Sequence, residues 1–335
     1  MSSNPQNLAD DGLERIKALD VLTTLPELLT HHLTVRPDDV AYKVYDNASK
    51  SWKDLTFKNV YDQVHAWRHA FAARSELVRG DRVAMLLPNC PEAVFFDLSA
   101  LSNTLVPVPL HAIDTPKSSA FILNDSGAKV LVTNKLLKWK QIREAAETPE
   151  IRLVVITDDK DCDDLEAPIP VMTKETFLKL GETSQLPKEA PKATDLAALV
   201  YTSGTTGKPK QSMLTHNNIL FSERVFVEGL ERTADDVMWM PAPLNHAVGF
   251  FHGLVAPMLL GGRSRLMQDF AVKDAIDLIN AEGATWSMCS TPFIYDIVNY
   301  LDAHPDESLP TYVLHSCGGA PVPGALIDRA HNHDI

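Results

Sequence analysis

Short runs rich in Val, Leu and Ile alternate with amphipathic segments through the first half of the chain. Such runs are typical of parallel strands that helices cover on both faces, and the segments between them are typical of crossover helices. Asn89 and Pro91 offer a helix N-cap and an early helical proline after the first run. The pattern predicts a doubly wound α/β fold, with strands at RVAMLL (82–87), LVPVPL (105–110), AKVLVT (128–133) and RLVVIT (152–157) and a helix at KLLKWKQIREAAE (135–147).

A second α/β series follows SQLPKEAPKATD at 184–195, a polar and Pro-rich stretch that we interpret as a linker. The series begins with LAALVYT at 196–202, and each later run is followed by a loop or a helical segment. We therefore expect a polar N-terminal segment at 1–25, a first α/β subdomain at 26–190 and a second at 191–335. The further strands of the second subdomain are predicted at DVMWMP (236–241), SRLMQ (264–268), ATWSMCS (284–290) and TYVLHS (311–316).

Composition and charge exclude several classes of function. The 335 residues are 45% hydrophobic and 22% charged, which is typical of a globular chain with room for about two domains. The formal net charge of -13 argues against a protein that covers nucleic acid phosphates. The four cysteines lie far apart without metal-ligand spacing, so we expect neither a disulfide framework nor a structural metal site. Because the N-terminus is polar and no apolar run is long enough for a bilayer, the sequence predicts a cytoplasmic protein without an integral membrane segment.

The segment YTSGTTGKPK at 201–210 is the strongest candidate for chemistry. Its glycines allow backbone N–H groups to turn toward phosphate oxygens, and its hydroxyls and lysines add donors and positive charge. It separates the run 196–202 from an amphipathic segment at 212–227, so we predict a strand, a loop and a helix in that order. Only two residues separate Gly204 from Gly207, so the segment is not a Walker A loop. By composition alone, an ordinary solvated turn is an equal alternative.

YTSGTTGKPK resembles the phosphate-loop signature of the adenylate-forming superfamily, which includes acyl-CoA synthetases, aryl-CoA ligases, firefly-type luciferases and adenylation domains of peptide synthetases. PAPLNHAVGFFHG at 241–253 is similar to the P-L-x-H-x-x-G motif of this family, and CGGAPVP at 317–323 is similar to its G-G-A-P loop. The resemblance runs over nearly the whole chain. It is greatest to bacterial short- and medium-chain fatty acyl-CoA synthetases.

The resemblance implies a role for each motif residue. Lys210 stands at the most persistent lysine of the family, and His246 stands at the histidine that borders the bound adenylate and the substrate carboxylate, so both are predicted to be catalytic. From the residues alone, a lone histidine is more often structural, as we expect of His252. The implied contacts are with the phosphates for Thr202, Ser203, Gly204, Thr205, Thr206, Gly207 and Lys208, with adenine for Gly319, Ala320 and Pro321, and with the substrate for Val248, Gly249, Phe250, Cys317 and Gly318.

The implied reaction uses ATP, Mg2+ and coenzyme A and needs no protein nucleophile, because the substrate carboxylate itself attacks ATP. We therefore interpret Cys317 as a small apolar residue. The segment 241–256 contains no Asp, Glu, Lys or Arg, and a buried ammonium without a partner is costly, so an uncharged tail is favoured over an amino acid. The expected substrate is a short- or medium-chain fatty acid, and an aryl or alicyclic acid is the alternative. The aromatic residues of the same segment are as consistent with core packing.

Two features favour a third hypothesis, a noncatalytic nucleotide-binding module. Gln211 and Ser212 replace the small residues that usually follow the lysine, and a bulky Gln could alter the loop. The chain ends at DRAHNHDI, before the ribose-binding Asp, the hinge and the small C-terminal domain that the resemblance implies.

The leading hypothesis is still a ligase. Under it, we expect the chain to be the N-terminal part of a longer ligase that is inactive by itself, and a homodimer is the candidate assembly.

Overall fold

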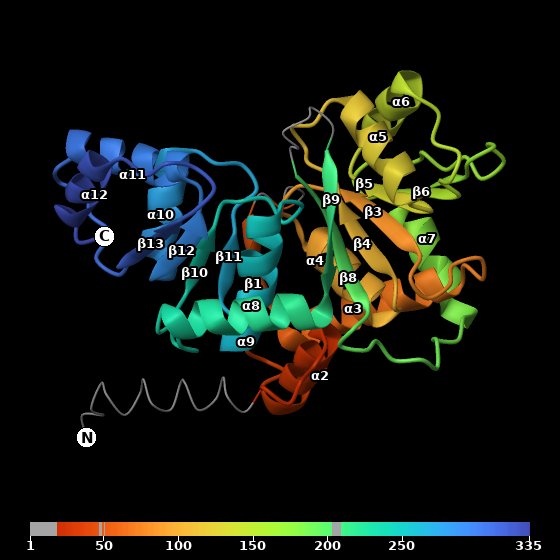
Figure 1. The fold of residues 1–335 in the computed structure, drawn as a ribbon, viewed down its shortest axis with the longest axis horizontal. Coiled ribbons are helices and arrows are strands. Elements are labelled where there is room, and N and C mark those ends of the chain that lie inside the picture. The colour runs from red at the N-terminus through yellow and green to blue at the C-terminus, as the bar shows by residue number, and fades with distance from the viewer. Residues whose placement is uncertain (1–18, 47–48, 50, 203–208) are drawn as a thin grey trace.

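The structure is a computed structural model that describes residues 19–46, 49, 51–202 and 209–335. Within these residues the strands form a five-stranded sheet, a six-stranded sheet and a two-stranded hairpin (Figure 1). Helix α2 (Leu25–Val35) lies beneath them, and a short 3-10 helix, η1 (Gly181–Thr183), precedes the linker. None of the described helices is long and apolar enough to cross a membrane.

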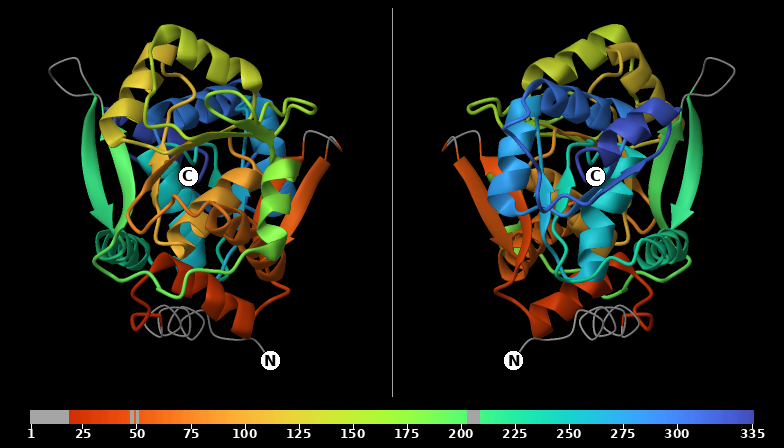
Figure 2. Two further views of the ribbon diagram at one scale, coloured as in Figure 1. Left: turned by 90° about the vertical axis from the view of Figure 1, so that its right-hand side faces the viewer. Right: turned by 90° about the vertical axis from the view of Figure 1, so that its left-hand side faces the viewer.

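The five-stranded sheet confirms the doubly wound prediction. Its strands are all parallel, in the order β4-β3-β5-β6-β7, and almost every residue in them is buried because helices cover both faces. Helices α3, α4 and α7 pack as one group, and α5 and α6 pack as the other (Figure 2). The bounds are β3 (Arg82–Leu86), β4 (Val106–Pro109), β5 (Val130–Thr133), β6 (Leu153–Ile156), β7 (Val171–Thr173), α3 (Phe57–Ala72), α4 (Pro91–Ser102), α5 (Pro116–Ser126), α6 (Leu136–Ala145) and α7 (Lys174–Leu180).

The six-stranded sheet has the order β13-β12-β10-β11-β1-β2. Helices α10, α11 and α12 pack together on one side, and α8, η2 and α9 pack together on the other. The segment η2 is a π-helix. The bounds are β1 (Val40–Asp46), β2 (Ser51–Thr56), β10 (Met238–Met240), β11 (Ser264–Leu266), β12 (Trp286–Cys289), β13 (Leu314–Cys317), α8 (His216–Gly229), η2 (Gly249–Val255), α9 (Ala256–Leu260), α10 (Val272–Glu282), α11 (Thr291–Ala303) and α12 (Gly324–His331).

Strands β1 and β2 join the second sheet although they come from the segment predicted for the first subdomain. Strand β1 pairs in parallel with β11, where Tyr42 lies opposite Ser264, and β2 pairs antiparallel with β1 at the edge. This pairing joins positions more than 200 residues apart, so no local pattern reveals it. The sheets therefore do not follow a single boundary near residue 190, and the division of the chain into two subdomains stays a prediction.

The predicted order of strand, loop and helix around residues 203–208 needs a correction. The chain continues as a second strand, so that β8 (Leu196–Thr202) and β9 (Lys210–Thr215) form an antiparallel hairpin before α8 begins. Figure 2 shows this hairpin at the outside of the molecule with α8 at its foot. The helix cannot start earlier, because Gln211 and Ser212 are paired with Tyr201 and Val200. Thr215 then caps it through a reciprocal pair of hydrogen bonds with Asn218.

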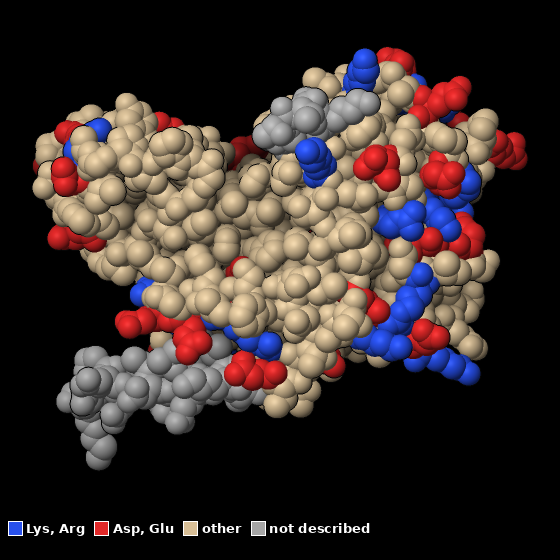
Figure 3. Space-filling view, viewed as in Figure 1, with Lys and Arg blue, Asp and Glu red and all other residues tan. Residues whose placement is uncertain are grey.

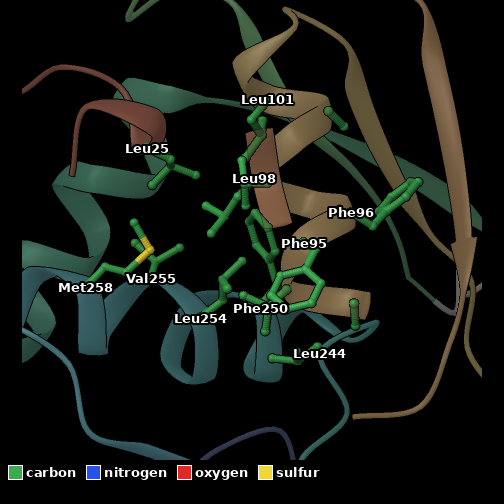
Figure 4. Packing of buried hydrophobic residues seen from close by; sticks show 14 of the residues in the cluster. Leu25, Phe95, Phe96, Leu98, Leu101, Leu244, Phe250, Leu254, Val255 and Met258 are labelled. Atoms are coloured by element: carbon green, nitrogen blue, oxygen red, sulfur yellow. The ribbon is translucent and has the colours of Figure 1, made fainter. Parts of the chain in front are cut away.

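One apolar core joins the two halves of the molecule. Helix α4 from the first sheet packs against η2 and α9 from the second, with Leu25 of α2 closing one end (Figure 4). Because protein interiors are close-packed, a core shared in this way resists sliding of one sheet against the other. The side chains that meet in Figure 4 include Phe95, Leu98, Leu101, Leu244, Phe250, Leu254, Val255 and Met258, whereas Phe96 points to the other side of α4.

This core contains an acid. Asp97 on α4 is 2% exposed, and within the described chain its Oδ2 atom has no hydrogen-bond partner. Burial raises the pKa of Asp97 well above its ordinary value. The carboxyl therefore stays protonated in the folded protein at pH values where it ionises in the unfolded chain. The contribution of protonated Asp97 to the free energy of unfolding is therefore complete below pH about 4, and it is lost as the pH rises from there.

We predict that Asp97→Asn raises the free energy of unfolding by about 1 to 3 kcal/mol at pH 7, because the amide does not have to be protonated on folding. Urea unfolding at pH 4, 5.5 and 7 measures the effect, and the gain should shrink toward pH 4. Asp306→Asn, at an exposed position, is the matched control and should leave stability unchanged. An equal gain at all three pH values would show that ionisation of Asp97 is not the cause.

Candidate active site

The ends of the hairpin carry two of the predicted phosphate-binding residues. Thr202 closes β8, Lys210 opens β9, and the two are partners in the register. Both are exposed, and the Lys210 ammonium has no ion pair or hydrogen bond with any residue that the structure describes. It is therefore available to an anion. The other predicted phosphate contacts lie outside the described residues and stay predictions: Ser203, Gly204, Thr205, Thr206, Gly207 and Lys208.

The hairpin accommodates the residues that distinguish this loop from its family. Gln211 and Ser212 lie in β9, and their side chains are exposed. Each is paired through its backbone with β8. The bulk of Gln211 therefore points to solvent and meets no packed neighbour that would have to move.

His246 lies in a buried turn that follows β10. Its own side chain is exposed, whereas Ala242, Leu244 and Asn245 around it are buried. The Val248 amide donates to His246 Nδ1 over 3.2 Å, which leaves the proton of the neutral imidazole on Nε2. Partial burial lowers the pKa of His246, and the neighbouring His111 lowers it further. His246 thus presents a neutral N–H donor at neutral pH.

Two buried asparagines hold this turn against the first sheet. Asn89 Nδ2 donates to the carbonyl oxygens of Ala242 and Met267 over 3.0 and 2.9 Å. Its Oδ1 accepts from the Leu244 amide over 2.7 Å. In the opposite direction, Asn245 Nδ2 donates to the carbonyl oxygen of Leu87 over 3.1 Å. We call this set of hydrogen bonds the asparagine clamp.

The clamp corrects the predicted role of Asn89. The N-cap of α4 is Cys90, with Pro91 in the first turn as expected. Asn89 is 2% exposed, and its side chain points away from the helix into the junction between the sheets. Sequence reasoning missed this role because Asn shortly before a helical proline is a common capping pattern.

His111 is a second residue that the sequence analysis missed. It follows β4, and its ring meets that of His246 edge to face, with the centroids 5.0 Å apart. Burial lowers the pKa of His111, while Asp114 acts in the opposite direction. Within the described chain its Nε2 atom is buried without a hydrogen-bond partner. Its position after a buried run, at the carboxyl edge of a parallel sheet, was the available signal.

The predicted substrate-site residues on η2 have two environments. Phe250 is 3% exposed and packs in the core that α4 shares with η2, so the core interpretation describes it (Figure 4). Val248 is half-buried at the start of η2. Gly249 is required by a close approach, because a Cβ atom there would collide with the backbone of Pro243. His252 is structural as expected: its Nδ1 lies 3.1 Å from Glu223 Oε2, and its ring packs on Phe226.

The predicted adenine loop follows β13. Gly319 has a φ of +80°, which favours glycine, and Gly318 approaches Met288 so closely that a Cβ would lie 2.9 Å from its Cε atom. Ala320 and Pro321 are exposed. Burial raises the pKa of the Cys317 thiol, which agrees with the interpretation that it is not a nucleophile. The roles of these residues toward a nucleotide stay predictions.

The motif segments follow the carboxyl ends of parallel strands in the two sheets, as ligand sites of open α/β sheets do. The His246 turn follows β10, the glycine loop follows β13, and His111 follows β4. Figure 3 shows the surface hollowed between the lobe of α10, α11 and α12 and the lobe of α5 and α6.

Comparison with known proteins decides the family. Residues 29–334 match the family described as AMP-binding enzyme. The chain belongs to this AMP-binding enzyme family. It is 33% identical over 304 residues to the medium-chain fatty-acid–CoA ligase of Escherichia coli K12, covering 89% of this chain and 51% of that enzyme. It is 28% identical over 229 residues to a 4-coumarate–CoA ligase of Pinus taeda, covering 67% of this chain and 41% of that enzyme.

Solved structures of similar fold agree. An acyl-CoA synthetase of Brucella canis superposes with a TM-score of 0.77 at 22% identity, covering 98% of this chain and 59% of that chain. The N-terminal domain of FACL13 from Mycobacterium tuberculosis superposes with a TM-score of 0.76 at 21% identity, covering 93% of this chain and 73% of that one. The chain of this AMP-binding enzyme therefore spans about half the length of the curated relative from E. coli.

The asparagine clamp predicts a large effect of Asn89→Ala. The substitution removes the partner of the Ala242 carbonyl group and the Leu244 amide in the turn and of the Met267 carbonyl group after β11, so we expect the free energy of unfolding to fall by about 2 to 5 kcal/mol. Urea unfolding measures the loss, and hydrogen exchange at the Leu244 amide should accelerate more than the global change explains. The control is Asn217→Ala, whose exposed side chain makes no hydrogen bond to the residues that the structure describes. Unchanged protection at Leu244 would contradict the clamp.

The imidazole pair predicts a change in titration. In His111→Ala, His246 loses a neighbour that disfavours its positive charge and gains solvent, so the pKa of His246 should rise toward its ordinary value. Two-dimensional 1H–13C NMR of the imidazole groups measures it directly. His331→Ala, at an exposed position on α12, should leave the His246 titration unchanged. A pKa of His246 that stays fixed in His111→Ala would mean that the two rings are not electrostatically coupled.

Proposed function

We propose that the protein activates a short- or medium-chain fatty acid with ATP to an acyl adenylate and, at its native length, transfers the acyl group to coenzyme A. The observation that carries this proposal is the His246 turn. It presents a neutral imidazole beside an apolar π-helix, and the segment 241–256 around it has no charged side chain. The similarity to the E. coli medium-chain fatty-acid–CoA ligase supports the same substrate class.

In the proposed reaction an oxygen of the substrate carboxylate forms a bond to the α-phosphorus of ATP, and the bond from that phosphorus to the pyrophosphate oxygen breaks. The thiolate of coenzyme A then attacks the acyl carbon, and AMP leaves. The His246 Nε2–H group would donate to the carboxylate or the α-phosphate and hold the reacting atoms in line. Lys210 would offset the negative charge that develops on the leaving pyrophosphate.

Mg2+ is expected with ATP, but the described residues hold no group of three or more His, Cys, Asp or Glu side chains that could bind a metal ion. No step is therefore assigned to the metal. His246 would act only through a hydrogen bond, and Lys210 only through its charge. A cytoplasmic location and a homodimeric assembly likewise stay predictions from the sequence.

An aryl acid is the second candidate substrate. The match to a 4-coumarate–CoA ligase supports it, and the half-buried Val248 and Phe251 at the start of η2 would suit a ring as well as a chain. A noncatalytic role is less well supported, because Gln211 is exposed within a regular hairpin and Lys210 is free of ion pairs among the residues described.

The first measurement is the mass of the protein purified from its source, because activity has to be tested at native length. ATP–pyrophosphate exchange is then measured with acetate, hexanoate, octanoate, decanoate, benzoate and cinnamate. We expect hexanoate to decanoate to give the highest kcat/KM. His246→Ala should lower that value about 10- to 100-fold, because it removes a donor aimed at the reacting atoms.

His304→Ala, at the exposed histidine that ends α11, is the matched control and should retain full activity. A higher kcat/KM for benzoate or cinnamate than for the fatty acids would identify an aryl acid as the substrate. Binding of ATP with no exchange for any carboxylate would overturn the ligase proposal in favour of a nucleotide-binding module. Full activity of His246→Ala would remove the proposed role of the imidazole while leaving the ligase reaction intact.

A further inference from the structure

A second cavity lies away from the candidate active site. It has a volume of about 540 Å3 and is bounded by α2, α3 and the linker residues 187–191. We call it the α2–α3 cavity. It lies near the foot of the hairpin, where the Leu25 amide donates to His216 Nδ1 over 3.2 Å and α8 begins (Figure 1). Thr202 and Lys210 are at the other end of the seven-residue strand β8, roughly 20 Å away at about 3.3 Å per residue.

The cavity contains an arginine without a counter-charge. Arg68 on α3 is half-buried, and its hydrogen bonds go to two neutral acceptors, Asn103 Oδ1 and the Ser102 carbonyl oxygen, each at 3.3 Å. No carboxylate lies within ion-pair distance of it in the part of the chain that the structure describes. Burial lowers the pKa of Arg68, and the neighbouring Tyr61 hydroxyl acts in the opposite direction. A partly desolvated guanidinium in this state is a strong site for a planar anion.

The acids that line the cavity already have partners. Glu27 Oε2 accepts from the Thr23 and Thr24 amides over 2.6 and 2.9 Å at the start of α2. Glu189 Oε2 accepts from Arg79 over 3.1 Å. Neither carboxylate is paired with Arg68, so the guanidinium keeps room for an anion from solution.

Two imidazoles and a lysine add donors. The rings of His31 and His65 line the cavity and have no hydrogen bond to any described residue, and Lys188 stands exposed at the rim. Burial lowers the pKa of His65, the nearby His69 and Arg68 lower it further, and Asp62 acts in the opposite direction, so the ring of His65 is neutral at pH 7. The cavity therefore offers the half-buried guanidinium of Arg68 with imidazole nitrogens beside it.

Apolar side chains form much of the remaining wall, together with three threonines of α2 and its N-cap. Leu29 and Val64 are buried behind the cavity, Leu22 and Val35 flank it, and Pro187 and Pro191 close the linker side. A volume of about 540 Å3 lies in the range of small-molecule sites. A single guanidinium matches a carboxylate in a bidentate pair, whereas a phosphate dianion would need more than one cation in so desolvated a place.

We propose that the α2–α3 cavity binds a small amphiphilic carboxylate, with its carboxylate on Arg68 and its apolar part against Leu29 and Val64. The proposal is independent of the ligase reaction, because the cavity lies at the opposite end of the hairpin from Lys210. A protein with no ligase activity would bind the same ligand.

The test uses decanoate below its micelle concentration and NMR of the histidine imidazoles at native length. Decanoate should shift the signals of His31 and His65 with its own Kd, while His246 reports separately on the candidate active site. Arg68→Gln should raise the Kd measured at His65 at least about 10-fold, the equivalent of one charge-assisted contact. Lys58→Gln, the same charge change on the same helix outside the cavity, should leave that Kd unchanged.

A second pair of variants tests the same proposal if Arg68→Gln does not fold. Val35 is 55% exposed at the rim, so Val35→Glu should weaken decanoate binding by repulsion and Val35→Lys should not. Decanol should bind at least about 10-fold more weakly than decanoate. Tighter binding of decyl phosphate, binding only to anionic vesicles, or a Kd at His65 indifferent to Arg68 and Val35 would each overturn the proposal.

Discussion

The hydrogen bonds of two buried asparagines fix the segment that the rest of the site depends on. The turn after β10 is buried, so its backbone groups cannot reach water and must find partners inside the protein. Asn89 supplies one donor and one acceptor to this turn and a second donor to the Met267 carbonyl after β11, and Asn245 returns a donor to the end of β3. An amide provides two N–H donors and an acceptor at once, whereas a carboxylate only accepts and a hydroxyl has a single donor. The first sheet therefore fixes the position of His246, and its own loop does not.

The apolar core at the same junction holds the two sheets rigidly together. Helix α4 begins at Pro91, two residues after Asn89, and it packs Phe95 on η2, which begins three residues after His246. A shift of one sheet against the other would open packed contacts and break buried hydrogen bonds together. Both terms oppose the shift, so the two sheets present their carboxyl ends at a fixed relative position.

The parts of the fold that the sequence predicts are those set by local burial. Every apolar run that we assigned to the five-stranded sheet is a strand in it, because parallel strands covered on both faces are apolar throughout. Strand β9 was missed because its residues Lys210 to Met213 are exposed, so no apolar alternation marks it and the helical pattern after it extends back over it. The asparagine clamp and the approach of His111 to His246 join residues well over 100 positions apart. Neither has a local pattern, although the motif around His246 was itself visible.

A second buried contact links the two motif-bearing segments. Helix α8 leads from the hairpin, η2 leads from the His246 turn, and they meet where Glu223 lies 3.1 Å from the His252 ring. Glu223 is fully buried, so its carboxyl needs this donor, and α8 cannot slide along η2 without losing it. Gly253 permits the close packing of η2 on the sheet, since a Cβ there would lie 2.7 Å from Met240 Cγ. The hairpin and the His246 turn are therefore both attached to the packed pair of α8 and η2. If the foot of the hairpin moves, either η2 moves with it or the buried contact between Glu223 and His252 breaks.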